Sequence, residues 1–203
     1  MSNRLYQQYP KEINEYIHHF IDEENKHSAI FGRFCNRYAG KIYQLKQVNF
    51  AREYETGEEE FLFFAKIVIF EEFVDYFNVK MSKDESLNPL VRQINAYHHA
   101  DEARHLAFGR KMIASLYDYY QSNWSAATKA GIEQYLLQYL SMTWRSYYNP
   151  AMYQDAGFTN SYAVYQSAFN AQTAQAFRAS LNHHCLKPFY HNQIIQTPSE
   201  SMP

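Results

Sequence analysis

The chain has 203 residues, enough for one domain with a full hydrophobic core, and its formal net charge is −2. Aromatic residues make up 18% of the chain, which excludes disorder over most of its length. Without net positive charge or a basic stretch the chain cannot neutralise phosphates, so we expect no binding to nucleic acid.

The sequence also indicates a compartment. The longest apolar run, Phe61–Phe70, is interrupted by Lys66 and is shorter than the roughly 20 residues that span a bilayer. No signal peptide with a basic start and an apolar centre opens the sequence. Cys35 and Cys185 form no Cys-x-x-Cys motif, which favours two inert thiols, with a single disulfide as the alternative. We therefore expect a cytoplasmic protein that does not bind a membrane.

Helices dominate the expected secondary structure, because glycine and proline are few and no segment alternates long enough to make a sheet. Periodicity and break signals predict helices from just after Pro10 to near Gly40, and over Glu58–Phe77, Leu90–Tyr120, Ala126–Tyr148 and Ser161–His183. We expect residues 80–89 to form a polar connector, in which Ser86 or Asn88 caps the next helix. The prediction is an all-α protein with one domain over residues 1–195 and a disordered tail over residues 196–203.

The third predicted helix carries a pattern typical of metal binding. His98, Glu102 and His105 are spaced i, i+4, i+7 and therefore share one face of the helix. His99 is the alternative to His98, but His98 is better placed relative to the other two residues. Two imidazoles and a carboxylate are ligands for a transition metal such as iron, manganese or zinc.

The first predicted helix carries a second copy of this pattern, Glu23-Glu24-Asn25-Lys26-His27. Glu24 and His27 lie within the apolar stripe of their helix, where polar side chains are costly unless hydrogen bonds or a metal satisfy them. Helical bundles that hold two metals carry Glu-x-x-His on each of two helices and a single Glu on each of two others. The two copies therefore predict a dinuclear metal site.

A further carboxylate is expected from the second predicted helix, which is apolar nearly all round. Glu71 continues the inward-facing line of this helix, and Glu72 is the competing choice. Carboxylates and imidazoles without a thiolate suit iron or manganese, and less often zinc. The predicted ligands are Glu24, His27, Glu71, His98, Glu102 and His105.

Two more acids, Glu23 and Asp101, each precede a predicted ligand Glu. One interpretation is that each accepts a hydrogen bond from a ligand histidine on the facing helix. The other is that they are exposed charges paired with Arg104 or Lys26. The sequence favours the two interpretations about equally.

These motifs resemble the ferritin-like di-iron oxygenases of the p-aminobenzoate N-oxygenase type. The resemblance covers about residues 11–120, and the C-terminal third only by its helix content. His98 points to this branch, because related di-iron families share the Asp-Glu-x-Arg-His part but lack the additional histidine. The resemblance implies a ferritin-like bundle with additional C-terminal helices. It also implies two iron ions, with manganese possible as a replacement.

The resemblance further implies how the ligands are shared. Glu24 and Glu102 would bridge the two metals, with His27 on one metal and the remaining ligands, Glu71, His98 and His105, on the other. The implied activity is oxygenation of an arylamine nitrogen or hydroxylation of a small aromatic substrate, using O₂ and an electron donor.

One carboxylate of the family's site has no counterpart, and we expect the family's first bundle helix to be absent. Glu133 is a weak substitute, and a partner chain is another source. A non-catalytic or metal-binding bundle with an incomplete dinuclear site is therefore the alternative function. A missing helix also leaves an apolar groove, which predicts a homodimer or larger assembly.

Overall fold

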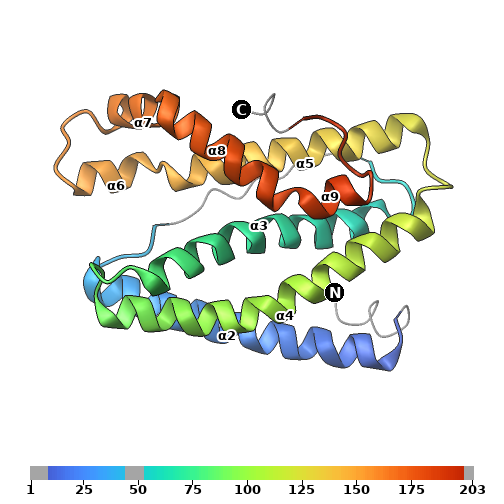
Figure 1. Ribbon diagram of the computed structural model, residues 1–203, viewed down its shortest axis with the longest axis horizontal. Helices are drawn as coiled ribbons and strands as arrows, with labels where there is room; N and C mark the ends of the chain where they lie inside the picture. The colour runs from blue at the N-terminus through green and yellow to red at the C-terminus, as the bar shows by residue number, and fades with distance from the viewer. Residues whose placement is uncertain (1–8, 44–52, 199–203) are drawn as a thin grey trace. The chain divides into compact units, whose positions relative to one another are not determined.

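The structure, a computed structural model, describes residues 9–43 and 53–198, and every regular element in these ranges is helical (Figure 1). This confirms the prediction of an all-α fold. None of the described helices is both long and apolar enough to cross a bilayer. In chain order the helices are α2 (Lys11–Tyr38), α3 (Glu58–Lys83), α4 (Pro89–Tyr120), α5 (Ala126–Tyr147), α6 (Pro150–Asp155), α7 (Ser161–Asn170), α8 (Gln172–Cys185) and α9 (Lys187–His191).

The chain divides into two compact units. The first comprises Met1–Ile42 and Asn78–His105, and the second comprises Tyr43–Phe77 and Leu106–Pro203. The division falls within α3 and within α4, so each of these helices contributes residues to both units. The single domain over residues 1–195 stays a prediction. So does the disordered tail, of which residues 199–203 lie outside the described ranges.

In the first unit, α2 and the N-terminal part of α4 are antiparallel neighbours (Figure 1). Glu23 contacts His105 and His27 contacts Asp101, so residue numbers rise along one helix as they fall along the other. α2 ends at Tyr38, shortly before Gly40, which has a φ of 69°. A glycine in this left-handed region is a common C-terminal stop, as the sequence predicts.

Aromatic side chains fill the interior of the second unit. Phe61, Phe73 and Trp144 are almost fully buried, and the rings of Phe73 and Trp144 meet edge to face with centroids 4.7 Å apart. Gly109 on α4 lies so close to α3 that an added Cβ would be 2.7 Å from Cγ2 of Val68. α3 and α4 therefore approach each other closely at this glycine.

α3 is longer than predicted, because it continues to Lys83 and leaves only residues 84–88 as a connector. Lys83 lies in the last turn, where a positive charge is favourable beside the exposed carbonyls. Of the two candidate caps for α4, Asn88 has the capping contact, since its Oδ1 accepts from the backbone N–H of Leu90 at 2.8 Å.

The C-terminal region departs further from the prediction. The helix expected over Ser161–His183 is broken into α7 and α8 at Ala171, whose ψ of 135° is extended. The predicted fourth helix ends at Tyr147, and Pro150 then begins α6 with Asn149 as its cap. α6 and α9 have too few residues to leave a periodic apolar pattern, so neither helix was predicted.

Candidate metal centre

Four of the predicted ligands come together in the first unit. Glu24 and His27 on α2, and Glu102 and His105 on α4, each offer one ligand atom, and all four atoms lie within 4.8 Å of one another. Glu102 and His105 are enclosed, His27 is buried and Glu24 is partly exposed. Glu-x-x-His spacing puts both side chains on one face of each helix, so antiparallel packing brings the two pairs together.

Both imidazoles of this group turn Nδ1 inward. Nδ1 of His105 lies 3.1 Å from Oε1 of Glu24 and 3.1 Å from Oε2 of Glu102. Nδ1 of His27 lies 3.2 Å from Oε1 of Glu24 and 3.5 Å from Oε1 of Glu102. Each carboxylate therefore contacts both imidazoles, and a cation among them would meet donors from both helices.

The outward nitrogens contact the two additional acids. Nε2 of His27 donates to Oδ2 of Asp101 at 3.0 Å, and Nε2 of His105 donates to Oε2 of Glu23 at 2.9 Å. Each acid lies on the helix that faces its histidine. Because a carboxylate favours the proton on Nε2, the lone pair on Nδ1 is left for the interior of the group. The contacts are thus those expected of acids that orient metal-binding histidines.

Arg104 joins these two acids. Its NH2 group donates to Oε1 of Glu23 at 2.5 Å and to Oδ1 of Asp101 at 2.6 Å. Both contacts that the sequence left open are therefore present, since each acid meets a histidine and also an arginine. Lys26, the other candidate partner, pairs with Asp22 instead.

The concentration of carboxylates favours positive charge on the histidines. Burial disfavours protonation of His105, but the hydrogen bonds that its ring donates to Glu102 and Glu24 outweigh burial and raise its pKa to about 10. Burial also disfavours protonation of His27, yet Glu24 and Asp101 raise its pKa. A metal ion that binds at Nδ1 takes the place of these protons, so the same carboxylates that hold a proton here would also attract a metal.

His98 lies at the edge of the four-residue group. Its Nε2 is 2.7 Å from Oε1 of Glu102. Its ring packs edge to face against His27 and Phe31, with centroid distances of 4.2 and 5.0 Å. The predicted additional ligand therefore directs one ring nitrogen at the carboxylate that both other imidazoles contact.

Asn78 is a residue of this site that the sequence analysis missed. It is only 2% exposed, and Nδ1 of His98 lies 3.2 Å from its Oδ1 and 3.0 Å from its Nδ2. Asn78 follows Glu71 by seven residues, or two helical turns, so the two share a face of α3. The predicted helix ended at Phe77, one residue before Asn78, so Asn78 was not placed on the same face as Glu71. The signal that could have found it is a polar side chain seven residues after Glu71 on the most apolar helix.

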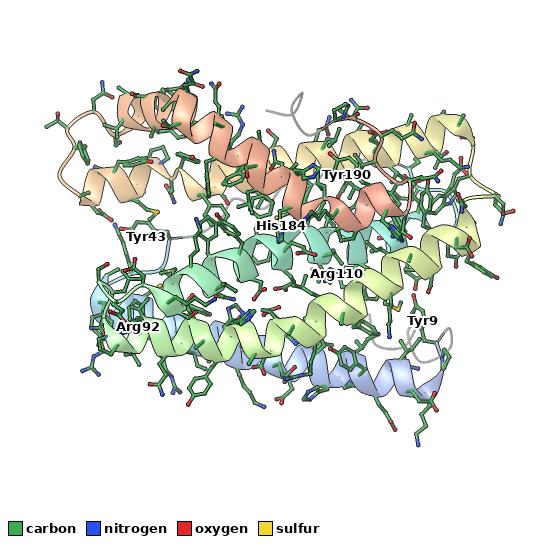
Figure 2. The ribbon with its side chains drawn as sticks, viewed as in Figure 1. Tyr9, Tyr43, Arg92, Arg110, His184 and Tyr190 are labelled. Carbon is green, nitrogen blue, oxygen red and sulfur yellow. The ribbon has the colours of Figure 1, made fainter. Side chains whose placement is uncertain are left out.

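Glu71 and Glu72 are buried residues of the second unit. Oε1 of Glu72 accepts from Nε of Arg110 at 2.7 Å and contacts its NH2 at 2.5 Å; Arg110 is labelled in Figure 2. Burial raises the pKa of Glu72, although Arg110 acts in the opposite direction. A carboxylate paired with a guanidinium is less available to a metal, which favours Glu71 of the two. Its assignment as a ligand stays a prediction.

Glu133, which the sequence analysis offered as a weak substitute for one carboxylate of the family's site, has other contacts. Its Oε1 accepts the backbone N–H groups of Gln196 and Thr197 at 2.9 and 2.7 Å. Tyr190, labelled in Figure 2, donates to the carbonyl of Thr197 at 3.1 Å. These contacts give Glu133 a part in fixing the C-terminal segment and lend no support to a role as a ligand.

The residues present fit a transition-metal centre. Bonds of about 2 Å from a metal to nitrogen or oxygen place two ligands of one ion up to about 4 Å apart, so a group of this spread matches one or two ions. The donors are carboxylate oxygens and imidazole nitrogens without a thiolate, which suits iron or manganese. Cys35 and Cys185 are free thiols outside this group.

The comparison with known proteins agrees with this chemistry. The family described as "P-aminobenzoate N-oxygenase AurF" matches residues 1–187, a range that contains both Glu-x-x-His copies, Glu71 and His98. No curated protein and no solved structure matches the chain. The family match covers well over half of the sequence, and the chain therefore belongs to the AurF family of ferritin-like di-iron oxygenases.

Proposed function

We propose that this chain is a di-iron, O₂-dependent oxygenase that acts on an arylamine nitrogen or hydroxylates a small aromatic substrate. The observation that carries the proposal is the crossed pair of Glu-x-x-His motifs, in which each carboxylate contacts both imidazoles. Membership of an oxygenase family supports the reaction class. We propose iron as the native metal and manganese as its closest substitute.

Six residues would hold the metals. Glu24 and Glu102 are suited to bridge two ions, because each faces both Nδ1 atoms. His27 would bind one ion, and the other would take Glu71, His98 and His105. Asp101 and Glu23 would hold the histidines in the metal-binding tautomer through Nε2.

The chain's own part in the reaction is to hold the metals, to orient the substrate and to exclude water. When bound, two iron ions would supply the activation of O₂ and the oxidising equivalents that the side chains lack. Enclosure of Glu102 and His105 keeps bulk water from one end of the group. Phe20 covers the His105 ring edge to face at 4.3 Å and strengthens this enclosure. An electron donor is required as a further partner.

The test combines metal content with reactivity toward O₂. We expect close to two iron ions per chain in protein purified without chelator, and an optical change when the reduced, iron-loaded protein meets O₂. Glu102→Ala should lose both properties, whereas Asp22→Asn, an exposed acid on the same helix as Glu24, should keep them. Iron-loaded protein that shows no optical change with O₂ would remove the oxygenase assignment.

A second candidate function is metal binding without catalysis, in a bundle with an incomplete dinuclear site. The observation that favours it is that no contact of Glu133 supports it as the remaining carboxylate. His98→Ala separates the two functions. Metal storage should tolerate loss of this additional ligand, whereas oxygen chemistry should not. About one metal per chain in the unaltered protein would support the second function.

The proposed setting of the protein is a cytoplasmic one, without nucleic-acid or membrane partners. We also propose that it forms a homodimer or a larger assembly. Several large apolar side chains of α2 and α4 are exposed, among them Ile21, Ile30 and Tyr97. Analytical ultracentrifugation should show a species heavier than 24.1 kDa, and a clean monomer at micromolar concentration would contradict the proposal.

A further inference from the structure

A buried arginine in the second unit has no acidic partner among the residues that the structure describes. Arg178 on α8 is only 3% exposed. Its NH1 group donates to the hydroxyl of Tyr148 at 3.4 Å, and its Nε is buried without a hydrogen-bond partner. A buried charge is costly unless it is paired and its donors are satisfied. Among the described residues no carboxylate forms an ion pair with Arg178, so its charge lacks compensation.

A second buried donor lies one turn away. Asn182 is fully buried and follows Arg178 by four residues, so both side chains leave the same face of α8. Oδ1 of Asn182 accepts from Nε1 of Trp144 at 2.6 Å. Indole N–H can only donate, and this fixes the amide with Nδ2 on the opposite side, where it has no partner. Two unsatisfied donors therefore share one face of one helix.

The surroundings of these donors add positive charge and flat aromatic surface. The guanidinium carbon of Arg178 lies 4.1 Å from the ring centroid of Phe169 and 5.7 Å from that of Tyr148. Arg145 lies 4.9 Å from the same Phe169 centroid and donates to the hydroxyl of Tyr165 at 3.1 Å. Two guanidinium groups thus share one aromatic ring, and in the described parts of the chain neither is paired with a carboxylate.

We infer that Arg178 and Asn182 form a binding site for a small carboxylate anion between α5, α7 and α8. The Nε edge of a guanidinium is suited to carboxylate oxygens, and the amide N–H of Asn182 offers a further donor to the same ligand. The carboxylate would supply the negative charge that both arginines lack. A water molecule would satisfy the donors but not the charge. The site uses no proposed metal ligand and stands independently of the function proposed above.

Calorimetric titration of the metal-loaded full chain with sodium acetate and with sodium benzoate tests this inference. Ionic strength is kept constant, and acetamide and benzamide serve as neutral controls of the same shape. We expect saturable binding of one carboxylate per chain and no binding of the amides. Absence of carboxylate binding, or equal binding of the amides, would overturn the inference.

Two variants assign the binding to this cluster. Arg178→Met should weaken carboxylate binding by about tenfold or more, since it removes the charge-assisted contact. Arg33→Met, which removes an exposed arginine from α2, should leave binding unchanged. A carboxylate bound to the metals would survive Arg178→Met, so retained binding in that variant would contradict the inference.

Asn182→Asp provides a second test that can be used even if Arg178→Met does not fold. It keeps an acceptor for Trp144 and places a carboxylate beside Arg178. The variant should therefore fold, have a melting temperature at least equal to that of the unaltered protein, and lose binding of the added carboxylate. A lower melting temperature with unchanged carboxylate binding would show that Arg178 needs no anion.

Discussion

The two ends of the candidate metal-binding group, Glu24, His27, Glu102 and His105, differ in exposure although their contacts are alike. Around His105, the inner carboxylate Glu102 and the outer carboxylate Glu23 have side chains 0% and 9% exposed. Around His27, the corresponding Glu24 and Asp101 are 35% and 32% exposed. The group therefore has a closed end at His105 and an open end at His27.

Because of this difference in exposure, we expect the two ends of the site to have different roles. At the closed end water cannot replace a lost ligand or acceptor, so each contact there should contribute more to metal affinity. At the open end O₂, substrate and water can approach Glu24. We therefore expect the closed end to hold metal firmly and the open end to exchange ligands.

Removal of the two inner carboxylates should have the largest effect. Glu102→Ala should lose nearly all bound metal, because this carboxylate contacts His27, His98 and His105 and no water can take its place. Glu24→Ala should retain part of the metal, since water reaches its position. Elemental analysis of both variants, purified side by side, measures the difference. Equal losses of metal in the two variants would show that exposure does not determine how firmly each end holds metal.

The outer acids provide a smaller, matched comparison. Glu23→Gln should weaken metal binding by about 10- to 100-fold, the usual effect of losing an outer acceptor. Asp101→Asn should lie at the low end of this range, because water can replace the lost acceptor for His27. Metal affinities from competition with a chelator check the order. A larger effect for Asp101→Asn would reverse the assignment of open and closed ends.

Asn78→Leu should affect stability more than metal binding. It leaves Nδ1 of His98 buried without its amide partner, which should lower the free energy of unfolding by about 1–3 kcal/mol. Metal affinity should fall by less than the 10- to 100-fold expected for loss of an acceptor to His27 or His105. Thermal unfolding and metal content are measured together.

The control for this variant is Asn95→Leu, a buried asparagine of α4 whose amide donates only to the carbonyl of Val91 among the contacts described. It should lower stability without changing metal affinity. If both variants change metal affinity equally, Asn78 has no particular role at His98.

Much of this site could be predicted because its signals are local. Glu24 with His27, and His98 with Glu102 and His105, are within two turns on single helices, so helical spacing alone puts them on common faces. The contacts of Glu23 and Asp101 with histidines on the opposite helix were only one of the two interpretations that the sequence left open. The same locality made long helices predictable from their apolar stripes.

What the sequence did not reveal depends on contacts far apart in the chain or on short elements. Asn78 meets His98 across 20 residues, and nothing in either helix alone signals that pairing. Nothing in the sequence distinguishes Arg178 and Asn182, and they become notable only when their partners at the C-terminal end of α5, Tyr148 and Trp144, are known. The break at Ala171 lies in a stretch without glycine or proline, so tertiary packing outweighs local propensity there.

The smallest effect on metal should come from Gly109→Ala, which disturbs the second unit alone. The new methyl group would meet Cγ2 of Val68 at 2.7 Å, closer than side chains pack, and should lower the free energy of unfolding by about 1–3 kcal/mol. Val68→Ala removes the opposing atom, so the double variant should recover most of the stability lost in Gly109→Ala. Metal content should stay at the level of the unaltered protein in all three variants. If Gly109→Ala loses metal and the double variant regains it, packing between α3 and α4 helps to hold the metal. Metal affinity would then depend on more than the difference in exposure between the ends at His105 and His27.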